Sequence, residues 1–358
     1  MESWFTTKLL HWYELNKRHL PWRNEKDPYK IWISEIILQQ TQVVQGTAYY
    51  LKFIGKYPTV QQLARAKEDE VLKLWQGLGY YSRARNLLET AKIIDKVYHG
   101  KIPEDYDKIK SFKGVGDYTA SAIASFAFDL PYAVLDGNVF RLLSRLFGIK
   151  TAIDTSQAKK EFSELATSLL NSKHPAQHNQ AIMEFGSQYC KPVNPDCSNC
   201  IFNTKCLAFK EKIVEELPFK SKKVKVKKRY FNYILIIDKE SNILIEKRAQ
   251  NDIWKGLYQF PIIETEAALK DDQLINSKEF KRLVKHNFRI ILQSKTYKHI
   301  LTHQHLYAIF YVIQTNVKHT NTANTSTLKK LTKLPFPRLI ELFLHDHNIK
   351  EFFKFDKI

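Results

Sequence analysis

The sequence predicts a multidomain protein in which an all-α region precedes a smaller α+β domain. Up to about Leu217, apolar residues recur at a spacing near 3.6, the period of helices with one buried face. From Lys220 to Arg229, seven of ten residues are Lys or Arg, which is typical of a solvated linker. Beyond this linker the apolar period shortens to that of strands. We therefore expect a first domain, a linker and a second domain at residues 1–217, 218–229 and 230–358.

In each region, several segments show clearly the spacing of apolar residues that is typical of its helices or strands. The helical segments of the first region lie at residues 29–44, 68–75, 82–98, 119–128, 138–147, 158–170 and 179–189. In the second region, alternating apolar runs predict strands within residues 230–238, 242–248, 257–263 and 305–314. Two helical stretches accompany these strands, at residues 266–285 and 337–348. This mixture indicates an α+β domain.

The chain is strongly basic. It holds 56 Lys and Arg residues against 37 Asp and Glu residues, which gives a net charge of +19 and a pI near 9.5. Such an excess attracts polyanions, so we expect a nucleic acid partner rather than a membrane surface. No apolar run reaches the length of a membrane span, and the N-terminal helix carries Glu2 and Glu14, unlike a secretory signal. We expect a cytoplasmic, nucleoid-associated monomer.

A glycine turn, Gly114-Val115-Gly116, stands directly before a helical run. Glycine at both positions lets the backbone adopt positive φ and approach a ligand closely. The first N–H groups of the following helix have no intrahelical partners, so they can bind an anion such as a DNA phosphate. An ordinary tight turn between packed helices is the alternative interpretation.

Two acids have surroundings that would separate their pKa values. Glu35 shares a predicted helix face with Ile31 and Leu38, so we expect partial desolvation and a raised pKa. Asp136 stands where a helix begins, and a helix N-terminus favours the charged carboxylate and keeps its pKa low. The alternatives are a solvent-facing Glu beside an apolar stripe and an Asp that only caps its helix.

Two further stretches have the composition of a binding surface. The polar run 39–42 follows the apolar run around Glu35, and it could form the edge of a site. Residues 77–87, GLGYYSRARNL, interleave two tyrosines with two arginines, which suits contacts to a phosphate backbone and to bases. A helix capped by Ser82, with both arginines in water, explains the same residues.

All four cysteines fall within residues 190–206, spaced C-x6-C-x2-C-x5-C. Disulfides are disfavoured in a chain without a secretion signal, so this group predicts a metal site. Zinc suits four thiolates but usually takes two short CxxC knuckles, whereas iron–sulfur clusters also use irregular spacing, so the spacing leaves both open. His299, His303 and His305 form a second candidate metal group, although strand-edge histidines more often make ordinary hydrogen bonds.

Together these motifs resemble the MutY-type adenine DNA glycosylases over nearly the whole chain. The matching segments are LPWR (20–23), SEIILQQTQV (34–43), LWQGLGYYSRARNL (74–87), GVGDYTA (114–120), LDGNV (135–139) and the cysteine spacing. The resemblance implies a helix-hairpin-helix fold with its hairpin at about 105–128, a [4Fe–4S] cluster in the loop 190–206 and a C-terminal Nudix-like domain. It also implies the excision of adenine mispaired with 8-oxoguanine or guanine in double-stranded DNA.

The resemblance also implies roles for individual residues. Glu35 would protonate the departing adenine, and Asp136 would stabilise or trap the sugar cation. Other catalytic and base contacts are implied for Tyr118, Asn138, Arg23 and Gln180. Contacts to DNA are implied for Gln40, Thr41, Leu78, Tyr80, Gly114 and Gly116. The oxidised guanine would be read where the family commonly has Phe-Ser-His, which here is Leu301, Thr302 and His303. The cluster ligands would be Cys190, Cys197, Cys200 and Cys206.

A pair of differently protonated acids fits such a reaction. An N-glycosidic bond breaks through an oxocarbenium-like state, so one acid protonates the leaving base while a negative group faces the sugar. At pH 7 a Glu of ordinary pKa is almost wholly ionised, and a useful acid needs a pKa about 2 units higher. The base must also leave the helical stack, at a cost that mispairing reduces.

Three other functions compete with this one. A bifunctional lyase of the endonuclease III type needs a Lys directly before Thr-Ala in the hairpin; this chain has Tyr118 there, so we predict a monofunctional enzyme. A Nudix pyrophosphatase needs a Glu six residues after the Gly that opens its motif, but Ile262 stands six residues after Gly256, the last glycine. A DNA-binding scaffold without activity is the third.

Overall fold

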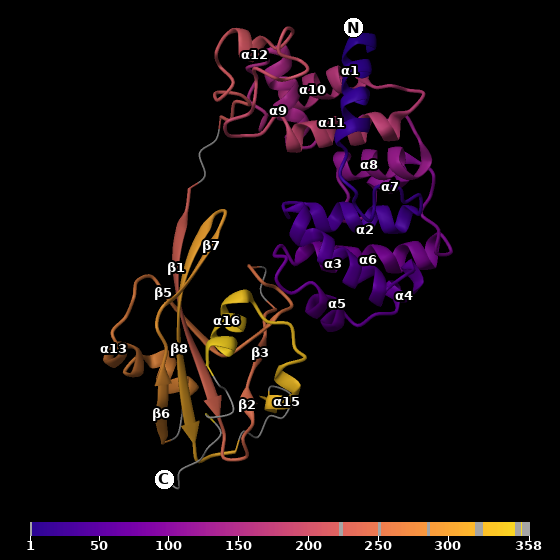
Figure 1. The fold of residues 1–358 in the computed structure, drawn as a ribbon. Coiled ribbons are helices and arrows are strands. Elements are labelled where there is room, and N and C mark those ends of the chain that lie inside the picture. The colour runs from indigo at the N-terminus through magenta and orange to yellow at the C-terminus, as the bar shows by residue number, and fades with distance from the viewer. Residues whose placement is uncertain are drawn as a thin grey trace. The chain divides into compact units, whose positions relative to one another are not determined.

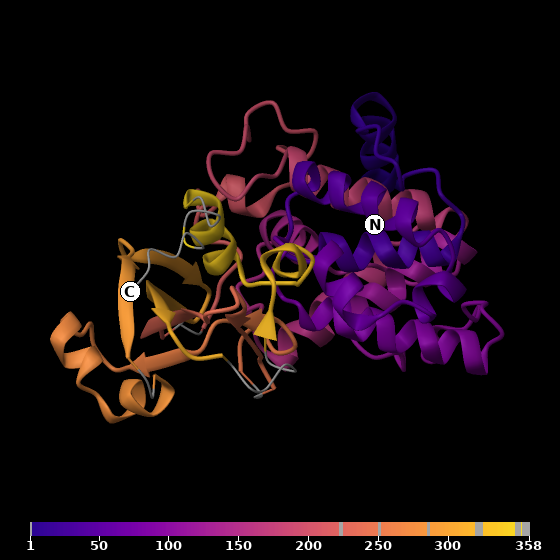
Figure 2. The same cartoon turned by 90° about the horizontal axis from the view of Figure 1, so that it is seen from below.

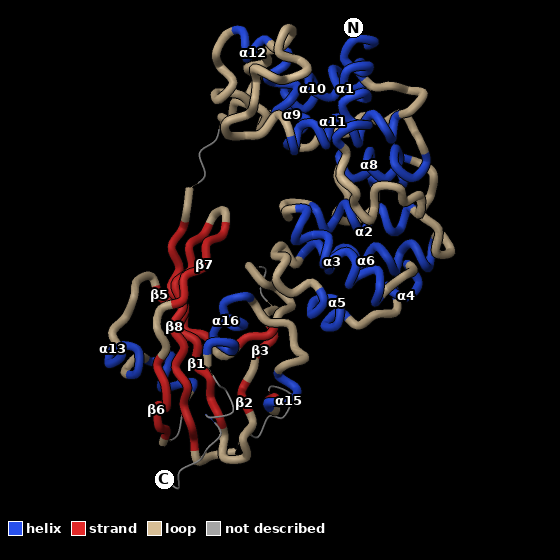
Figure 3. Tube along the Cα trace, viewed as in Figure 1, coloured by secondary structure: helices blue, strands red, loops and turns tan. Residues whose placement is uncertain are grey.

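The computed structural model describes residues 2–221, 225–249, 252–284, 287–318, 325–347 and 352. The chain divides into two compact units: Met1–Arg65 with Asn86–Lys223, and Ala66–Arg85 with Val224–Ile358. Helices make up the regular structure of the first unit, whereas the second holds the strands of the described residues (Figure 1, Figure 3). The predicted order, a helical region and then an α+β domain, is confirmed. The predicted linker 218–229 lies partly outside the described residues, and the predicted domain boundaries stay a prediction.

Several helices of the first unit start where the sequence supplies a capping side chain. The side chains of Asp27, Thr59, Asp105 and Thr155 each accept a hydrogen bond from a backbone N–H of the first turn that follows. The helices are α1 (Glu2–Asn16), α2 (Pro28–Leu38), α3 (Val43–Lys56), α4 (Val60–Ala64), α6 (Ser82–Val97), which begins in the segment grouped with the second unit, α7 (Tyr106–Lys110), α8 (Asp117–Phe128), α9 (Gly137–Phe147), α10 (Ser156–Leu169), α11 (Pro175–Gln188) and α12 (Leu207–Lys210).

The prediction of one continuous helix over residues 29–44 is wrong at its C-terminal end. Helix α2 stops at Leu38, because Gln39 has ψ 112° and Gln40 has φ +56°, and neither value is helical. A new helix, α3, begins at Val43. The break leaves the polar run exposed or half-buried between two helices, and the Gln39 amide donates a hydrogen bond to the Thr119 hydroxyl (3.2 Å).

The second unit is built on a seven-stranded sheet whose central strands are parallel. Strand β1 (Lys227–Ile237) pairs in parallel with β8 (Gln304–Thr315). The strand order is β6-β8-β1-β2-β9, with β5 also paired to β1 and β7 to β8. The remaining strands are β2 (Ile243–Leu244), β5 (Ile262–Thr265), β6 (Phe288–Gln293), β7 (Tyr297–Leu301) and β9 (Thr325–Ser326), and a separate pair is formed by β3 (Glu246–Lys247) and β4 (Tyr258–Gln259).

Both faces of the sheet are covered, which explains why β1 is apolar on both sides. Phe231, Tyr233 and their alternate neighbours pack in a core with Phe343 of α16 (Arg338–Asp346). Ile234 faces a second core that includes Phe280. Figure 2 shows the sheet with its helices from below. The helices of this unit are α5 (Glu68–Leu74), α13 (Asp271–Ile275), α14 (Lys278–Leu283), α15 (Leu328–Leu331) and α16.

Several expected elements of this unit differ in detail. The helix expected at 266–285 is two short helices, α13 and α14, separated at Asn276, and residue 285 lies outside the described residues. The strand expected at 242–248 is divided between β2 and β3, and strands β6 and β7 were not predicted. Among the described residues, no helix has the length and apolar character that a membrane span requires.

Candidate active site

Glu35 lies on helix α2, whose start is well defined. The Asp27 carboxylate accepts a hydrogen bond from the Tyr29 N–H (2.9 Å), and Pro28 occupies the first helical position, where its missing N–H has no intrahelical partner to lose. Most of the helix is buried, and Glu35 is only 5% exposed. The solvent-facing alternative for Glu35 is therefore wrong.

Tyr118 reaches Glu35 from the first turn of α8, which follows the glycine turn 114–116. Gly114 has φ +81°, and a Cβ there would lie 2.9 Å from the Asn86 side chain, so this position requires glycine. Gly116 has φ −98° and is the extended residue before α8, so the expectation of positive φ at both glycines is wrong for Gly116. The Tyr118 hydroxyl donates a hydrogen bond of 2.5 Å to the Glu35 carboxyl group.

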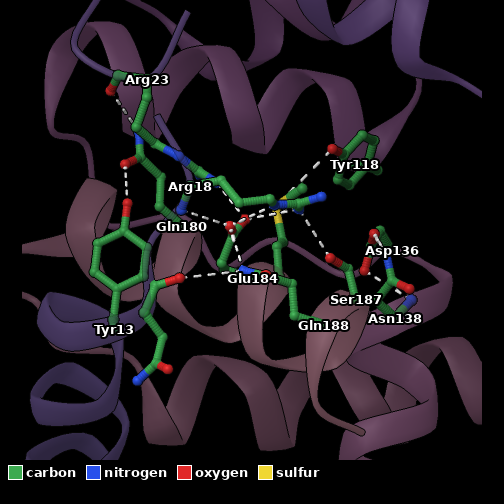
Figure 4. Close-up of polar contacts among 12 residues, drawn as sticks. Tyr13, Arg18, Arg23, Tyr118, Asp136, Asn138, Gln180, Glu184, Ser187 and Gln188 are labelled. Carbon is green, nitrogen blue, oxygen red and sulfur yellow. Dashed lines mark hydrogen bonds and ion pairs between the residues drawn. The ribbon is translucent and has the colours of Figure 1, made fainter. Parts of the chain in front are cut away.

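Asp136 caps helix α9, as the sequence predicts. One carboxylate oxygen accepts hydrogen bonds from the backbone N–H groups of Asn138 (2.9 Å) and Val139 (2.8 Å). The other oxygen accepts one from the Asn138 side-chain amide (2.7 Å; Figure 4). These bonds hold the carboxylate in one orientation at the start of the helix.

Both acids line one cleft of the first unit. Its wall includes Glu35, Tyr118, Asp136 and Asn138. The same cleft is lined by other residues predicted to contact base or DNA, namely Arg23, Gln180, Gln40, Thr41 and Gly116. A ligand that enters this cleft would therefore meet both carboxyl groups.

The pKa of Glu35 is raised, as its apolar neighbours in the sequence indicate. Burial raises its pKa to about 7, the hydrogen bond from Tyr118 opposes this rise, and the charge of Asp136 adds to it. Burial also raises the pKa of Tyr118 well above its usual value. The phenol therefore stays protonated and can donate its hydrogen bond to Glu35. At neutral pH, Glu35 is thus close to the midpoint of its titration.

The expectation of a low pKa for Asp136 is wrong. Burial raises the pKa of Asp136, although the hydrogen bonds from Val139 and Asn138 and the charge of Arg141 oppose the rise. The helix start provides donors, but the carboxyl group is withdrawn from water further than sequence alone indicates. Both acids therefore have raised pKa values. They differ in the groups that hydrogen-bond to them: Glu35 accepts from the Tyr118 hydroxyl, whereas Asp136 accepts from backbone N–H groups at the start of α9.

The predicted base contacts, Arg23 and Gln180, are already joined to each other. The Gln180 amide donates to the Arg23 carbonyl oxygen (3.3 Å), and its own oxygen accepts a hydrogen bond from the Tyr13 hydroxyl (2.9 Å). The Arg23 guanidinium is paired with the carboxylate of Glu184 and lies near the face of the Tyr13 ring, 5.7 Å from its centroid. These contacts fix both side chains at the wall of the cleft (Figure 4).

Sequence reasoning missed two residues of this wall, Arg18 and Glu184. Arg18 donates to Glu184 through its backbone N–H (3.0 Å), its Nε (2.7 Å) and its Nη2 (3.0 Å). Glu184 stands four residues after Gln180, on the same face of a helix that the sequence predicts, and that spacing is the signal that could have revealed it.

Arg141 connects the Asp136 side of the cleft to the cysteine loop. Its Nη2 donates to the Asn138 side-chain oxygen (2.9 Å) and to the Gly186 carbonyl oxygen (2.6 Å), and its Nε donates to the Cys190 carbonyl oxygen (2.8 Å). Since Asn138 also donates to Asp136, an unbroken chain of hydrogen bonds runs from the Asp136 carboxylate to the first cysteine.

The four cysteines line one small pocket of the first unit. All four are free thiols, and the pocket is otherwise lined largely by apolar side chains such as Phe185 and Phe202. Burial raises the pKa of Cys200 to about 12, so its thiol would not ionise without a cation. Four convergent thiols in an apolar pocket fit the donor set of an iron–sulfur cluster. Among the described residues, no three or more His, Cys, Asp or Glu side chains are drawn close enough together to hold a metal ion as they stand.

The predicted DNA-contacting loop is partly turned inward. Tyr80 is 50% exposed with φ +47°, whereas Leu78 is buried. Arg83 is buried as well: its guanidinium lies 5.2 Å from the Trp75 ring centroid and donates to the Leu78 carbonyl oxygen (3.3 Å). The expectation that both arginines of this loop face phosphate or water is therefore wrong for Arg83, which packs under the loop.

The predicted lesion-reading residues form the turn between β7 and β8. Leu301 ends β7, and Thr302 and His303 precede β8. Within the second unit, the Thr302 hydroxyl is hydrogen-bonded to the Tyr80 hydroxyl (3.0 Å). Among the described residues, which include all three histidines of this region, no group of three or more potential metal ligands is gathered, so the structure gives the histidine group no support as a metal site.

Comparison with known families defines the class of protein. Residues 33–168 match the family model of the HhH-GPD superfamily base excision DNA repair proteins, and residues 232–346 match that of the NUDIX domain. The chain is therefore a helix-hairpin-helix base excision repair protein with a C-terminal Nudix-like domain.

Curated relatives narrow this class. The chain is 36% identical to the adenine DNA glycosylase of Buchnera aphidicola subsp. Schizaphis graminum, over 78% of this chain and 82% of that protein. It is 34% identical to the adenine DNA glycosylase of Arabidopsis thaliana, over 71% of this chain and 46% of that protein. The chain belongs to the adenine DNA glycosylase family, and the predicted family and enzyme class are confirmed.

Solved structures agree on the fold of the first unit. A thermostable thymine-DNA glycosylase superposes with a TM-score of 0.54 at 29% identity, covering 58% of this chain and 95% of that one. An endonuclease III bound non-covalently to DNA gives a TM-score of 0.52 at 21% identity, covering 59% of this chain and 95% of that one, which shows the fold alone.

Proposed function

We propose that this protein removes adenine from adenine:8-oxoguanine and adenine:guanine mispairs in double-stranded DNA by hydrolysing the N-glycosidic bond. The observation that carries the proposal is the meeting of Glu35 and Asp136 at one cleft, with Tyr118 donating to Glu35. Curated relatives named adenine DNA glycosylases support adenine as the base. The net charge of +19 supports a polyanionic partner, which would place the protein at the nucleoid in the cytoplasm.

The geometry supports a two-step reaction. Glu35, with a pKa of about 7, holds a proton in a large fraction of molecules at neutral pH and gives it to a ring nitrogen of the flipped adenine as the C–N bond breaks. The bonding electrons leave with the base, and the sugar becomes an oxocarbenium-like cation that Asp136 stabilises. Water then adds to the sugar carbon and returns a proton to the Glu35 carboxylate.

Other residues would orient the reactants. Asn138 and the start of α9 fix Asp136, and Arg23 and Gln180, which line the same cleft, would contact the flipped base. Contacts to the DNA around the site would come from Gln40, Thr41, Leu78, Tyr80, Gly114 and Gly116. The turn of Leu301, Thr302 and His303 would read the oxidised guanine, with the Thr302 hydroxyl exchanging its bond to Tyr80 for one to the lesion.

The cysteine pocket would hold a [4Fe–4S] cluster. Cys190, Cys197, Cys200 and Cys206 would be its ligands, since they line one pocket and since helix-hairpin-helix glycosylases of the endonuclease III type generally carry this cofactor. The cluster would supply cross-links within the loop 190–206 and no reaction step. Arg141 would transmit the position of that loop to Asn138 and Asp136.

Two observations would test the proposal. We expect single-turnover assays to convert an adenine:8-oxoguanine duplex into an abasic product that is cut only after alkali, and the purified protein to be yellow-brown. A protein that binds the mispair without releasing adenine would be the scaffold, and a guanine:cytosine duplex is the control that should remain intact.

Tyr118→Lys is expected to convert the enzyme into a lyase. An amine beside Glu35 and Asp136 can form a Schiff base with the opened sugar, whereas the phenol cannot. The variant should cut the strand without alkali and yield an adduct that borohydride traps, and Tyr118→Phe should do neither. Strand cutting and a trapped adduct from the unmodified protein would contradict the monofunctional assignment.

A further inference from the structure

Glu184 is a buried carboxylate among the residues that line the cleft. It lies on α11 and is 2% exposed. Besides the three hydrogen bonds from Arg18, it accepts one from the Gln188 amide (2.7 Å) and one from the Arg23 guanidinium. Figure 4 shows Arg18, Arg23 and Gln188 converging on this single side chain.

Glu184 remains ionised in this setting. Burial opposes its ionisation, but the hydrogen bonds from Arg18 and the charge of Arg23 outweigh that effect and hold the pKa of Glu184 below its usual value. Arg18, Arg23 and Glu184 thus form an ionic group in which two guanidinium groups surround one carboxylate. Removal of that carboxylate would leave two cations in the wall where there is now a net charge of +1.

This ionic group and Glu35 line the same cleft. The charge of Arg23 already acts on Glu35, in the direction that favours its ionised form. The other titratable and charged groups that line the cleft are Arg18 after α1, Tyr106 of α7, Asp117 and Tyr118 of α8, Asp136 before α9, Lys159 and Lys160 of α10, and Glu184 of α11. Helix α3 contributes Val43 to the lining.

We propose that Glu184 is a positioning residue that holds Arg18 and Arg23 on the cleft wall and balances their charge, so that Glu35 keeps its proton for the departing base. The inference rests on the proposed function of Glu35 as the acid. Without Glu184, the Arg23 guanidinium loses its carboxylate partner and becomes available to pair with Glu35. A buried carboxylate paired with a guanidinium gives up its proton more readily, and it can no longer serve as the acid.

The test is the pH dependence of adenine release by Glu184→Gln, which keeps the shape of the side chain and removes its charge. In single-turnover assays of the full-length protein from pH 5.5 to 9, we expect the descending limb of the rate to move about one unit to lower pH. The rate at pH 8 should therefore fall about tenfold further than the rate at pH 5.5. A merely structural role would lower the rate by one factor at every pH and leave the midpoint unmoved, which would overturn the inference.

A second variant separates charge from packing. Arg23→Gln combined with Glu184→Gln restores the net charge of the wall, so its midpoint should return toward that of the parent even if its rate is low. Glu184→Asp, which keeps the charge, should also keep the parental midpoint. If the parent releases no adenine, the proposed function fails; if the parent is active and none of these midpoints differs, only this inference fails.

Discussion

Glu35→Gln is expected to lower the single-turnover rate of adenine release by about 10³-fold or more. Gln has almost the same shape and can still accept the hydrogen bond from Tyr118, but it has no proton of suitable acidity to give. Since the pKa of Glu35 is about 7, the parent should lose activity as the pH rises through neutrality. Residual activity within about tenfold of the parent would remove Glu35 from the acid role.

A measurement of thermal stability would distinguish the expected loss of activity in Glu35→Gln from unfolding. The pKa of Glu35 is raised from 4.5 to about 7 in the folded protein, so ionisation opposes folding and stability falls between these two pH values. The full difference is about 3 kcal/mol, and Gln removes it. Glu35→Gln should therefore melt at a higher temperature than the parent at pH 8 and lose that advantage near pH 4. Glu164→Gln, an exposed acid of α10, is the matched control and should change neither property.

Asp136→Asn is expected to reduce adenine release by about 10²- to 10³-fold while leaving the fold almost intact. Asn caps a helix as well as Asp does, so the bonds from the N–H groups of Asn138 and Val139 can persist. The negative charge that would face the sugar cation is lost, and electrostatic stabilisation of this kind is worth about 10²- to 10³-fold in rate.

Asp105→Asn supplies the matched control for this change. Asp105 caps α7 by accepting a hydrogen bond from the Lys108 N–H (2.9 Å), and it does not line the cleft. Both cap variants should unfold within about 1 kcal/mol of the parent in urea, but only Asp136→Asn should lose activity. Equal activity of Asp136→Asn and the parent would show that Asp136 is a helix cap and nothing more.

The sequence predicts those parts of the site that depend on local pattern. The apolar neighbours of Glu35 indicated a desolvated carboxyl group with a raised pKa, although they left a solvent-facing Glu open, and Asp-Gly-Asn predicted the cap at Asp136. The break after Leu38 was missed, because Val43 and Val44 resume the apolar pattern after the polar run 39–42, although Gln40 has positive φ. Backbone geometry of that kind is fixed by tertiary contacts and leaves no trace in periodicity.

The remaining misses have the same origin in long-range contacts. Arg18 and Glu184 are 166 residues apart in the chain, so nothing local shows that they meet in the structure. Asp136 has a raised rather than a low pKa, because residues remote in sequence shield it from water. Strand β6 was missed since its residues FRIILQ lack a clean alternation, and its pairing with β8 is interrupted by a register shift.

The parallel pairing of β1 with β8 also constrains how the protein is made. Lys227 pairs with Gln304 and Ile237 with Gln314, so the central ladder of the sheet cannot form until nearly the whole chain has left the ribosome. During that interval β1, with its run of apolar side chains, has no partner on one edge and is exposed to self-association. Nascent chains that stall before β8 is synthesised would therefore be the ones that depend most on chaperones.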